Sequence, residues 1–491
     1  MQRPAYSVDD ERAYLARGYW RDDDTLWHWL CRHAAERPEA PAVVSPAAGR
    51  LTWRALHERV LRVAQGLKDK GIDAGDIVAV QLPNTPEFLL VHLAAARLGA
   101  VLCTVHMPYR GAEIEAILAH SGASLFFTSA YPFTELETAA PLPASHPAPD
   151  ARDAFLLLYT SGTTASPKAV PHPYRTLLGN SRLGAREHGL SQHSKILCAA
   201  PLSHLYGLYS LHCAWAVGAC SVLLPAYKPD ELAQTIERER PSALWAGPAH
   251  MAACRNAGLF DKHDWSSLEL AIVSGSIAPP ALMREVATKL PRCALTQLWG
   301  MTELQAGLYT RPSDAPERSA SSVGRPSPGT ELRLAADGEL QVRGPLAFSG
   351  YYKNDDATRV AFTHDGWFRT GDLAVERDGY FAITGRSKDI INRGGVKFNP
   401  ADVEALLDAH PQIQQAAIVP MPDPVLGEKA CAFVTLRPGC DAPSLDDVVR
   451  YLLGREIAKN KLPERLVVIP EMPLTPTRKI IKSRLRPPEQ P

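Results

Sequence analysis

The sequence lacks the patterns typical of secreted, membrane-spanning or nucleic-acid-binding proteins. Lys+Arg and Asp+Glu both number 53 among 491 residues, so the formal net charge is zero and favours no anionic partner. Nine cysteines are scattered between Cys31 and Cys440 without a CxxC pair, which indicates reduced thiols and neither disulfides nor a zinc site. The apolar runs are too short to span a bilayer, and the first twenty residues have no apolar core for a signal peptide. We therefore expect a cytoplasmic protein without a membrane span.

What is present is typical of a large globular enzyme. Apolar residues make up 45% and charged residues 22%, and the length allows several domains. Leu56, Val60, Val63 and Leu67 share one face of a predicted helix, for which Thr52 is a suitable N-cap. Strands predicted at 76–82, 100–107 and 124–129 alternate with helices predicted at 88–98 and 113–119. This alternation predicts an α/β fold with a parallel sheet wrapped by helices.

The pattern changes twice further along the chain. Residues 139–153 contain four prolines and are predicted to form an exposed connector, after which the α/β alternation continues from Phe155 to about Trp299. Asp337-Gly338 and Asp378-Gly379 then predict two β-hairpins, which makes a β-rich section. A separate α+β pattern follows, with a helix predicted to start at Asn399-Pro400, two strands and a helix predicted to open at Ser444. We predict a large domain over 1–387 and a small mobile domain over 388–491.

The segment "LLLYTSGTTASPKAVPH" (156–172) follows a buried strand and raises three interpretations. It does not match the G-x-S-x-G elbow of serine hydrolases, nor the G-x-x-x-x-G-K-[ST] loop of kinases and other P-loop proteins. Its hydroxyls, backbone N–H groups and single cation at Lys168 suit a looser grip on phosphate, such as a pyrophosphate that must later leave. A polar surface loop without a ligand is the alternative.

This segment resembles the Y-T-S-G-T-T-G-x-P-K-G signature of the adenylate-forming superfamily, which includes acyl- and aryl-CoA synthetases, peptide-synthetase adenylation domains and beetle luciferases. Further segments resemble the superfamily's signatures in the same order along essentially the whole chain. They are "PLSHLYG" (201–207), "SGSIAP" (274–279), "WGMTE" (299–303), "GELQVRGP" (338–345), "FRTGD" (368–372), "GRSKDIINRGG" (385–395) and "PLTPTRKI" (473–480). The early "RGYW", "NRGGVKFNPADVE" and "PDPVLGEKACAFV" most resemble the aryl- and alicyclic-acid branch, such as 2,3-dihydroxybenzoate–AMP ligases and cyclohexanecarboxylate–CoA ligases.

The resemblance implies ATP and CoA as substrates, Mg²⁺ as the metal, and a set of nucleotide-binding residues. Thr302 would contact the α-phosphate, Glu303 would bind Mg²⁺, and Asp372 would accept both ribose hydroxyls. The other implied nucleotide contacts are Thr160, Ser161, Gly162, Thr163, Thr164, Lys168, Ser276, Ile277, Trp299, Gly300 and Arg386. Taken alone, Trp299 is equally compatible with a core tryptophan, and Arg386 with a surface arginine.

The resemblance also implies two half-reactions in one cleft. Lys479 would bridge the acid and the phosphate while an acyl-AMP forms. The small domain would then turn about a hinge at Lys388, so that Gly394 and Gly395 line a tunnel for the thiol. Arg393 or Lys397 at the tunnel mouth could serve CoA or a carrier protein.

The acid pocket is implied at His204, Leu205, Gly275 and Gly300, with His204 also gating the thiol channel; a lone histidine is more often structural. Relatives that activate dihydroxybenzoate have an asparagine at the position of Leu205, which hydrogen-bonds the ortho hydroxyl. Leucine cannot make this bond, so we expect an apolar acid that is benzoate-like, alicyclic or medium-chain.

Three residues depart from the superfamily pattern. Ala165 and Ala169 replace loop glycines, and Arg478 replaces the glycine before the catalytic lysine. Alanine disfavours a positive φ, so the first two could stiffen the phosphate loop. Two alternatives to a CoA ligase remain open: an enzyme that loads the phosphopantetheine arm of a carrier protein, and a nucleotide-binding protein that has lost turnover.

Overall fold

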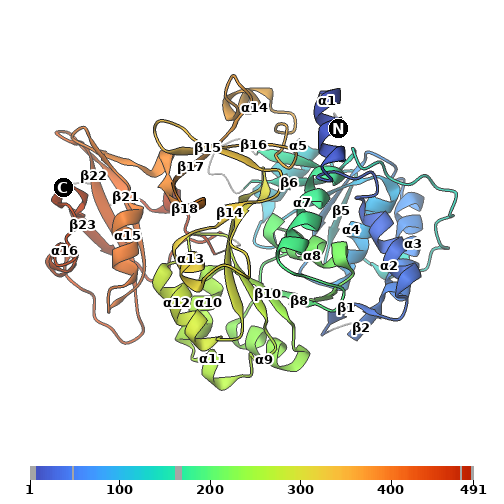
Figure 1. Ribbon diagram of the computed structural model, residues 1–491, viewed down its shortest axis with the longest axis horizontal. Helices are drawn as coiled ribbons and strands as arrows, with labels where there is room; N and C mark the ends of the chain where they lie inside the picture. Colours follow the sequence, from blue (N-terminus) through green and yellow to red (C-terminus); the bar gives the residue numbers. More distant parts are fainter. Residues whose placement is uncertain (1–6, 47–48, 161–167, 476–477, 488–491) are drawn as a thin grey trace. The chain divides into compact units, whose positions relative to one another are not determined.

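The structure is a computed structural model that describes residues 7–46, 49–160, 168–475 and 478–487. The chain divides into two compact units, drawn in Figure 1. The first unit comprises Met1–Leu332 and Val342–Phe368, and the second comprises Arg333–Gln341 and Arg369–Pro491. The predicted hinge at Lys388, and with it the boundary between 387 and 388, concerns motion and stays a prediction.

A five-stranded sheet forms the first half of the first unit. Its order is β5-β3-β4-β6-β7, with the first four strands parallel and β7 antiparallel to β6. The strands are β3 (Ile77–Gln81), β4 (Val101–Thr104), β5 (Leu125–Thr128), β6 (Ala154–Tyr159) and β7 (Ala169–Pro173). The predicted parallel α/β arrangement is therefore confirmed for this part of the chain.

A nine-stranded sheet follows, in the order β14-β13-β12-β11-β10-β8-β9-β1-β2. The strands are β1 (Pro41–Ser45), β2 (Gly49–Thr52), β8 (Lys195–Cys198), β9 (Cys220–Val222), β10 (Ala243–Ala246), β11 (Leu270–Val273), β12 (Ala294–Met301), β13 (Gln305–Tyr309) and β14 (Arg325–Pro326). The central strands pair in parallel, while β2 at one edge and β13 and β14 at the other pair antiparallel.

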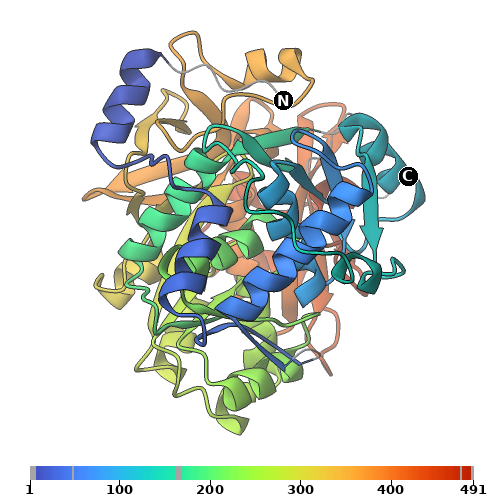
Figure 2. The same cartoon turned by 90° about the vertical axis from the view of Figure 1, so that its right-hand side faces the viewer.

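Fourteen helices are described in the first unit. They are α1 (Val8–Ala16), α2 (Leu26–Glu36), α3 (Trp53–Asp69), α4 (Pro86–Leu98), α5 (Gly111–Ser121), α6 (Thr134–Glu137), α7 (Tyr174–Glu187), α8 (Leu205–Val217), α9 (Pro229–Glu239), α10 (Pro248–Asn256), α11 (Leu259–Lys262), α12 (Pro280–Lys289), α13 (Pro316–Ser321) and α14 (Asp355–Ala361). In Figure 2 the blue helices α2 and α3 lie side by side. Across the described residues, no helix is long and apolar enough to cross a membrane.

Helix α3 confirms the sequence-based prediction in detail. The Thr52 hydroxyl accepts a hydrogen bond from the Ala55 N–H at 3.2 Å, as an N-cap does. The four residues predicted to share one face are all buried. The proline-rich connector is mostly exposed, but Leu142 is buried and Arg97 donates to the carbonyls of His146 and Pro147. The connector is thus fixed to the core at two places.

The nine-stranded sheet lies between two hydrophobic cores, and successive side chains along its strands point into one core and then the other. Ala243 and Trp245 of β10 belong to the core that both sheets share with α3, α4 and α8, while Leu244 and Ala246 belong to the core under α9–α12. Successive residues of a strand point to opposite faces, so a continuous apolar strand is expected where both faces are covered.

Among the described residues, the second unit contains one sheet, most of a second sheet whose strand ends at 331–332, 342–343 and 368 belong to the first unit, and the two helices α15 (Ala401–Asp408) and α16 (Leu445–Leu453). One sheet has the order β15-β16-β17-β18, with β15 (Glu331–Leu334), β16 (Glu339–Arg343), β17 (Phe368–Arg377) and β18 (Tyr380–Arg386). The other has the order β20-β19-β22-β21 with β23 beside β22, made of β19 (Ile391–Arg393), β20 (Val396–Phe398), β21 (Ile413–Asp423), β22 (Gly427–Leu436) and β23 (Arg465–Val468). Short 3₁₀ segments are η1 (Ser387–Asp389), η2 (Lys459–Lys461) and η3 (Lys482–Arg484).

The hairpin turn and the Ser444 cap predicted in the second unit are confirmed, whereas the predicted Asn399 cap is displaced by one residue. Asp378 and Gly379 have φ of 54° and 79°, which suits the tight β17–β18 hairpin. Ser444 caps α16 by accepting from the Asp447 N–H. Asn399 accepts from the Ala401 N–H, although the N-cap position itself falls on Pro400, one residue later than expected.

Candidate functional site

Most residues predicted to hold the nucleotide and acid in the first unit lie at one edge of the nine-stranded sheet. His204 follows β8, Gly275–Ile277 follow β11, and Trp299–Glu303 end β12 and turn toward β13. These are the carboxyl ends of neighbouring parallel strands, where open α/β sheets bind their ligands. Ile277 is 52% exposed, so an apolar side chain is presented to solvent at this edge.

The β12–β13 hairpin has a tight backbone that holds Trp299. A β-bulge lies between Trp299 and Gly300. A Cβ at Gly300 would lie 1.7 Å from the carbonyl oxygen of Gln305, and one at Gly307 would lie 2.8 Å from the indole of Trp299. The indole is therefore packed on Gly307 and only 8% exposed. Both the adenine-flanking and the core interpretation of Trp299 stay compatible with this position.

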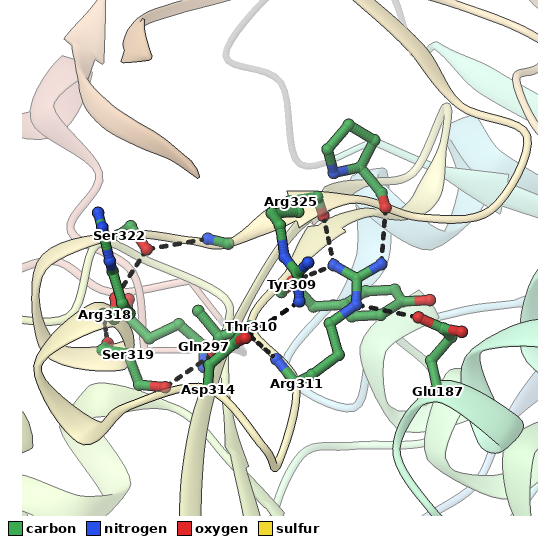
Figure 3. Close-up of polar contacts among 12 residues, drawn as sticks. Glu187, Gln297, Tyr309, Thr310, Arg311, Asp314, Arg318, Ser319, Ser322 and Arg325 are labelled. Carbon is green, nitrogen blue, oxygen red and sulfur yellow. Dashed lines mark hydrogen bonds and ion pairs between the residues drawn. The ribbon is translucent and has the colours of Figure 1, made fainter. Parts of the chain in front are cut away.

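A polar network ties this hairpin to its neighbours (Figure 3). The Arg311 guanidinium donates to the carbonyls of Tyr309, Arg325 and Pro326 and forms an ion pair with Glu187 at 3.0 Å. The network links α7, β13 and β14 through groups that are mostly half-buried. The Arg311 side chain thus joins the end of β13 to β14 and to the last residue of α7.

Glu303 is 8% exposed and has two contacts with residues 348–351. The Tyr351 hydroxyl donates to Glu303 Oε1 at 2.8 Å, and the Phe348 N–H donates to the Glu303 carbonyl at 2.9 Å. Lys168 Nζ lies 5.2 Å from the centroid of the Tyr351 ring. Tyr351 therefore joins the predicted magnesium ligand to the predicted phosphate lysine, and sequence reasoning missed it.

The predicted phosphate loop connects two antiparallel strands. Ser161, Gly162, Thr163 and Thr164 lie outside the described residues, as does Ala165. Thr160 follows β6, and its N–H donates to the Lys168 carbonyl at 2.9 Å. A P-loop leads from a strand into a helix, whereas this loop leads from β6 into the antiparallel strand β7. The strand pairing therefore excludes a P-loop, as the sequence motif already did.

Ala169 lies in strand β7 and not in the loop. It pairs with Tyr159, is fully buried, and is not among the residues with positive φ. The expectation that Ala169 stiffens the loop is therefore wrong, because an extended backbone accepts alanine without strain.

His204 caps helix α8. Its Nδ1 accepts from the Tyr206 N–H at 3.2 Å, and its ring stacks on His106 with centroids 6.1 Å apart. Ser203 Oγ lies 2.9 Å from His106 Nδ1, and burial lowers the pKa of His106 to about 4, so this ring stays neutral. Leu205, the first residue of α8, is 4% exposed and belongs to the shared core. His204 thus has a structural role whether or not it gates a channel.

In the second unit, the two predicted ribose contacts are cross-strand neighbours. Asp372 on β17 pairs with Arg386 on β18, and Arg386 Nε lies 2.9 Å from Asp372 Oδ1. The preceding Gly371 has φ of 70° and donates its N–H to Glu339 Oε1 at 3.1 Å. Asp372 is only 5% exposed, so its carboxylate is already oriented by Arg386.

Lys479 lies within electrostatic range of the same pair. Its pKa is lowered to about 8, first by burial and then by Arg386, while Asp372 and Asp389 oppose the shift. The local backbone is closed by a β-bridge between Leu474 and Ile480 and by a hydrogen bond from Thr475 N–H to the Lys479 carbonyl.

Arg478 has a φ of 62°, the left-handed conformation that favours glycine. This is the position where the superfamily pattern has glycine. The departure therefore places an arginine in a backbone conformation suited to glycine, directly before Lys479.

The predicted thiol-tunnel residues form a hairpin tip. Gly394 and Gly395 have φ of 60° and 86° and join β19 to β20. Arg393 is engaged in an ion pair with Glu464, whereas Lys397 is exposed. Of the two basic residues predicted at the tunnel mouth, Lys397 is thus the one presented to solvent. The predicted hinge residue Lys388 is exposed in η1.

The donor set of the first unit fits magnesium bound together with nucleotide. Among the described residues, no group of three or more His, Cys, Asp and Glu could hold a metal ion. Mg²⁺ is usually held by one or two carboxylates plus substrate phosphates and water, and not by an all-protein cage. The buried Glu303 carboxylate, fixed by one oxygen on Tyr351, suits that role.

A separate surface cavity of about 320 Å³ contains none of the predicted site residues. Its lining includes Arg37, Arg50 and Lys195. Two of its cations have partners already, since Arg37 donates to the Gly218 carbonyl and Lys195 pairs with Glu239.

Comparisons with known proteins agree with this arrangement. Residues 30–352 match the AMP-binding enzyme family, and residues 402–479 match the AMP-binding enzyme C-terminal domain. The chain belongs to the AMP-binding enzyme family. All nine cysteines are free thiols, which agrees with the reduced thiols predicted from their scattered positions.

Relatives of this AMP-binding enzyme cover nearly its whole length. A putative acyl-CoA synthetase YngI of Bacillus subtilis is 30% identical, over 94% of this chain and 96% of its own. The 2,3-dihydroxybenzoate-AMP ligase of the same species is 31% identical, over 96% and 95%. The crystal structure of the anthranilate CoA ligase AuaEII with anthranoyl-AMP superposes with a TM-score of 0.87 at 25% identity, covering 95% of this chain and 96% of that one.

The fold and the reaction family are therefore established. The AMP-binding enzyme has the α/β architecture of adenylate-forming acyl- and aryl-CoA ligases, with a large N-terminal and a smaller C-terminal part. ATP and CoA are the substrates of such enzymes, and Mg²⁺ is their usual ion. Small-molecule acids are the partners that fit this family.

Proposed function

We propose that this protein activates an apolar carboxylic acid with ATP to an acyl-AMP and then transfers the acyl group to the thiol of CoA. The observation that carries the proposal is the grouping of Lys479, Asp372 and Arg386 in the second unit. A half-buried lysine beside an arginine and two carboxylates suits the handling of a negatively charged nucleotide at the reacting centre.

In the first half-reaction, a carboxylate oxygen of the acid attacks the α-phosphorus and pyrophosphate leaves. The negative charge that develops there requires positive groups placed in advance. We assign Lys479 to the carboxylate and α-phosphate, Thr302 to the α-phosphate, and Lys168 with the 160–164 loop to the departing pyrophosphate. Glu303 would hold Mg²⁺, which supplies charge neutralisation when bound.

Nucleotide recognition completes this assignment. We assign Asp372 to the ribose hydroxyls, with Arg386 holding its carboxylate in place. Ser276, Ile277, Trp299 and Gly300 at the sheet edge are assigned to adenine.

In the second half-reaction, the thiol attacks the acyl carbon and AMP leaves with the oxygen that came from the acid. We assign the Gly394-Gly395 tip to the thiol tunnel, because two glycines at positive φ permit close backbone approach. This step includes the predicted rotation of 388–491 about Lys388.

The acid is inferred to be benzoate-like, alicyclic or medium-chain. Leu205 is buried among apolar residues, and a leucine there cannot hydrogen-bond an ortho hydroxyl. His204 and Gly275 complete the proposed pocket. The relative that acts on 2,3-dihydroxybenzoate is therefore a guide to the chemistry and not to the substrate. We also propose a cytoplasmic location, where ATP and CoA are both available.

A carrier protein is the second candidate acceptor. A relative of almost full length is named as an AMP ligase, while others are named as CoA ligases or synthetases. Both acceptors present the same thiol arm. The exposed Lys397 near the Gly394-Gly395 tip could contact a phosphate of either one.

The test is incubation of the purified protein with Mg-ATP, CoA and a panel of acids, followed by mass spectrometry. The panel holds benzoates with and without ortho hydroxyls, cyclohexane carboxylates and C4–C10 fatty acids. An acyl-CoA from an acid without the hydroxyl is expected. Preference for ortho-hydroxybenzoates would contradict the interpretation of Leu205, acyl-AMP without thioester would favour the carrier protein, and no AMP or adenylate from any acid would indicate lost turnover.

A further inference from the structure

Tyr351 is buried between two residues that the proposed function assigns to the phosphates. Its hydroxyl donates to Glu303 Oε1 at 2.8 Å, and its ring lies under Lys168 Nζ at 5.2 Å from the centroid. The side chain is 9% exposed, so both contacts form away from bulk water. A single aromatic residue therefore contacts an anion through its polar end and a cation through its face.

The backbone around Tyr351 is fixed independently of these contacts. The Tyr351 N–H donates to the Thr358 hydroxyl at 2.9 Å, and a Cβ at Gly350 would lie 2.8 Å from Thr358 Cγ2. The Phe348 ring packs edge-on against Tyr351 with centroids 4.9 Å apart. The ring position is thus determined by α14 and the preceding turn, and the residues it contacts are positioned relative to it.

The hydroxyl is a donor at any ordinary pH. A tyrosine phenol ordinarily has a pKa of about 10, so the hydroxyl keeps its proton at neutral pH. A donor on Oε1 restrains the orientation of the Glu303 carboxylate. Groups that orient a metal ligand in this way typically contribute ten- to a hundredfold in metal affinity.

The ring acts on Lys168 by a different interaction. The electron-rich face of an aromatic ring attracts an ammonium group within about 6 Å of its centroid. Lys168 lies directly before β7, whose first residue accepts a hydrogen bond from the Tyr352 N–H at 2.8 Å. The ring face and the backbone bond beside it therefore hold the lysine near its working position.

We propose that Tyr351 is a positioning residue for Mg-ATP, which orients Glu303 through its hydroxyl and Lys168 through its ring. This inference rests on the proposed function, which assigns Glu303 to the metal and Lys168 to phosphate. It predicts that the two halves of one side chain affect different quantities: the hydroxyl affects the metal-dependent part of ATP binding, and the ring affects binding of ATP with or without metal.

The test is calorimetric titration of the full-length protein with ATP in Mg²⁺ and with ATP in EDTA. Tyr351→Phe keeps the ring and removes the hydroxyl, and we expect it to weaken Mg-ATP binding about tenfold while ATP in EDTA changes little. Tyr351→Leu removes the ring as well and should also weaken ATP in EDTA about threefold. Tyr352→Phe is the matched control, since its hydroxyl donates to the Ser121 carbonyl at 3.4 Å and not to Glu303, and it should leave both affinities unchanged.

Three outcomes would overturn the proposal. An unchanged affinity for Mg-ATP in Tyr351→Phe would refute the role of the hydroxyl, provided that wild type binds Mg-ATP normally. Equal weakening of both affinities in Tyr351→Phe would show a general effect on the fold, which thermal melting of each variant measures separately. Absence of ATP binding in wild type would contradict the proposed function itself.

Discussion

The two units hold their proposed ATP-binding residues by different means. In the first unit, Glu303 and Trp299 lie in a packed strand end where two glycines touch neighbouring atoms, and a buried tyrosine orients the carboxylate. In the second, Asp372 and Lys479 are held by a cross-strand ion pair and by short turns that include residues at positive φ. Substitutions should therefore mainly cost folding stability in the first unit and mainly change charge handling in the second.

The largest expected contrast is in acid stability. Burial lowers the pKa values of four histidines of the first unit far below the usual 6.5, and they are His92, His172, His188 and His212. His92 Nε2 and His212 Nε2 lie 3.0 Å apart in the core, so a second proton there would also be repelled. In the unfolded chain these histidines take up a proton near pH 6.5, whereas in the folded protein they do so only at much lower pH. The free energy of unfolding is therefore greatest above pH 6.5. Below that pH it falls by about 1.4 kcal/mol per pH unit for each histidine.

In the second unit, two titratable groups have opposite effects on stability as pH falls, so its stability should depend less on pH than that of the first unit. Burial and Glu404 raise the pKa of Asp408 to about 7, so this carboxyl favours the folded state as pH falls from 7 toward 4. His410, with a lowered pKa, acts in the other direction. Hydrogen exchange at pH 7 and pH 5 should show the first unit losing protection first. Earlier loss in the second unit would contradict this comparison.

Lys479→Ala should lower the rate of acyl-AMP formation by about a hundred- to a thousandfold, the usual effect of removing a charge-stabilising group. Because Lys479 is only half-buried and the neighbouring β-bridge between Leu474 and Ile480 is formed by backbone atoms, the melting temperature should hardly change. Lys482→Ala is the control, since Lys482 pairs with Glu404 at 2.7 Å. Pyrophosphate release measures both variants, and near-normal release by Lys479→Ala would refute the role of this lysine.

Gly300→Ala should destabilise the first unit by about 3 kcal/mol, because its Cβ would meet the Gln305 carbonyl at 1.7 Å. Gly189→Ala serves as the control: its φ is 69° and no atom lies within 4 Å of the added Cβ, so only a backbone cost of about 1 kcal/mol is expected. Chemical denaturation followed by tryptophan fluorescence compares the two. Equal effects would show that the hairpin relaxes around the added methyl group.

Arg478→Gly should have the smallest effect, a gain of about 1 kcal/mol in the stability of the second unit, because glycine adopts a φ of 62° without strain. The measurement is thermal melting alongside pyrophosphate release. A loss of stability would mean that the contacts of the arginine side chain outweigh its backbone strain.

The sequence was sufficient where the determining contacts are local. The N-cap and periodicity of 52–69 predicted α3, and Asp378-Gly379 predicted a hairpin whose pairing brings Asp372 opposite Arg386. Strand β7, "AVPHP", was missed because two prolines hide its strand pattern.

Tyr351 was missed because its contact with Glu303 spans 48 residues. Its signal in the sequence is only a pair of tyrosines after glycine. Contacts of this range are set by tertiary packing, which periodicity and turn residues do not encode.

The most direct test of the account follows the oxygen atoms of the acid. An acid accepted in the panel is prepared with both carboxylate oxygens as ¹⁸O and incubated with Mg-ATP and CoA. If the carboxylate attacks the α-phosphorus, each AMP released carries one ¹⁸O and each thioester keeps the other. AMP without the label, or label in inorganic phosphate with ADP as the product, would contradict adenylation by this protein.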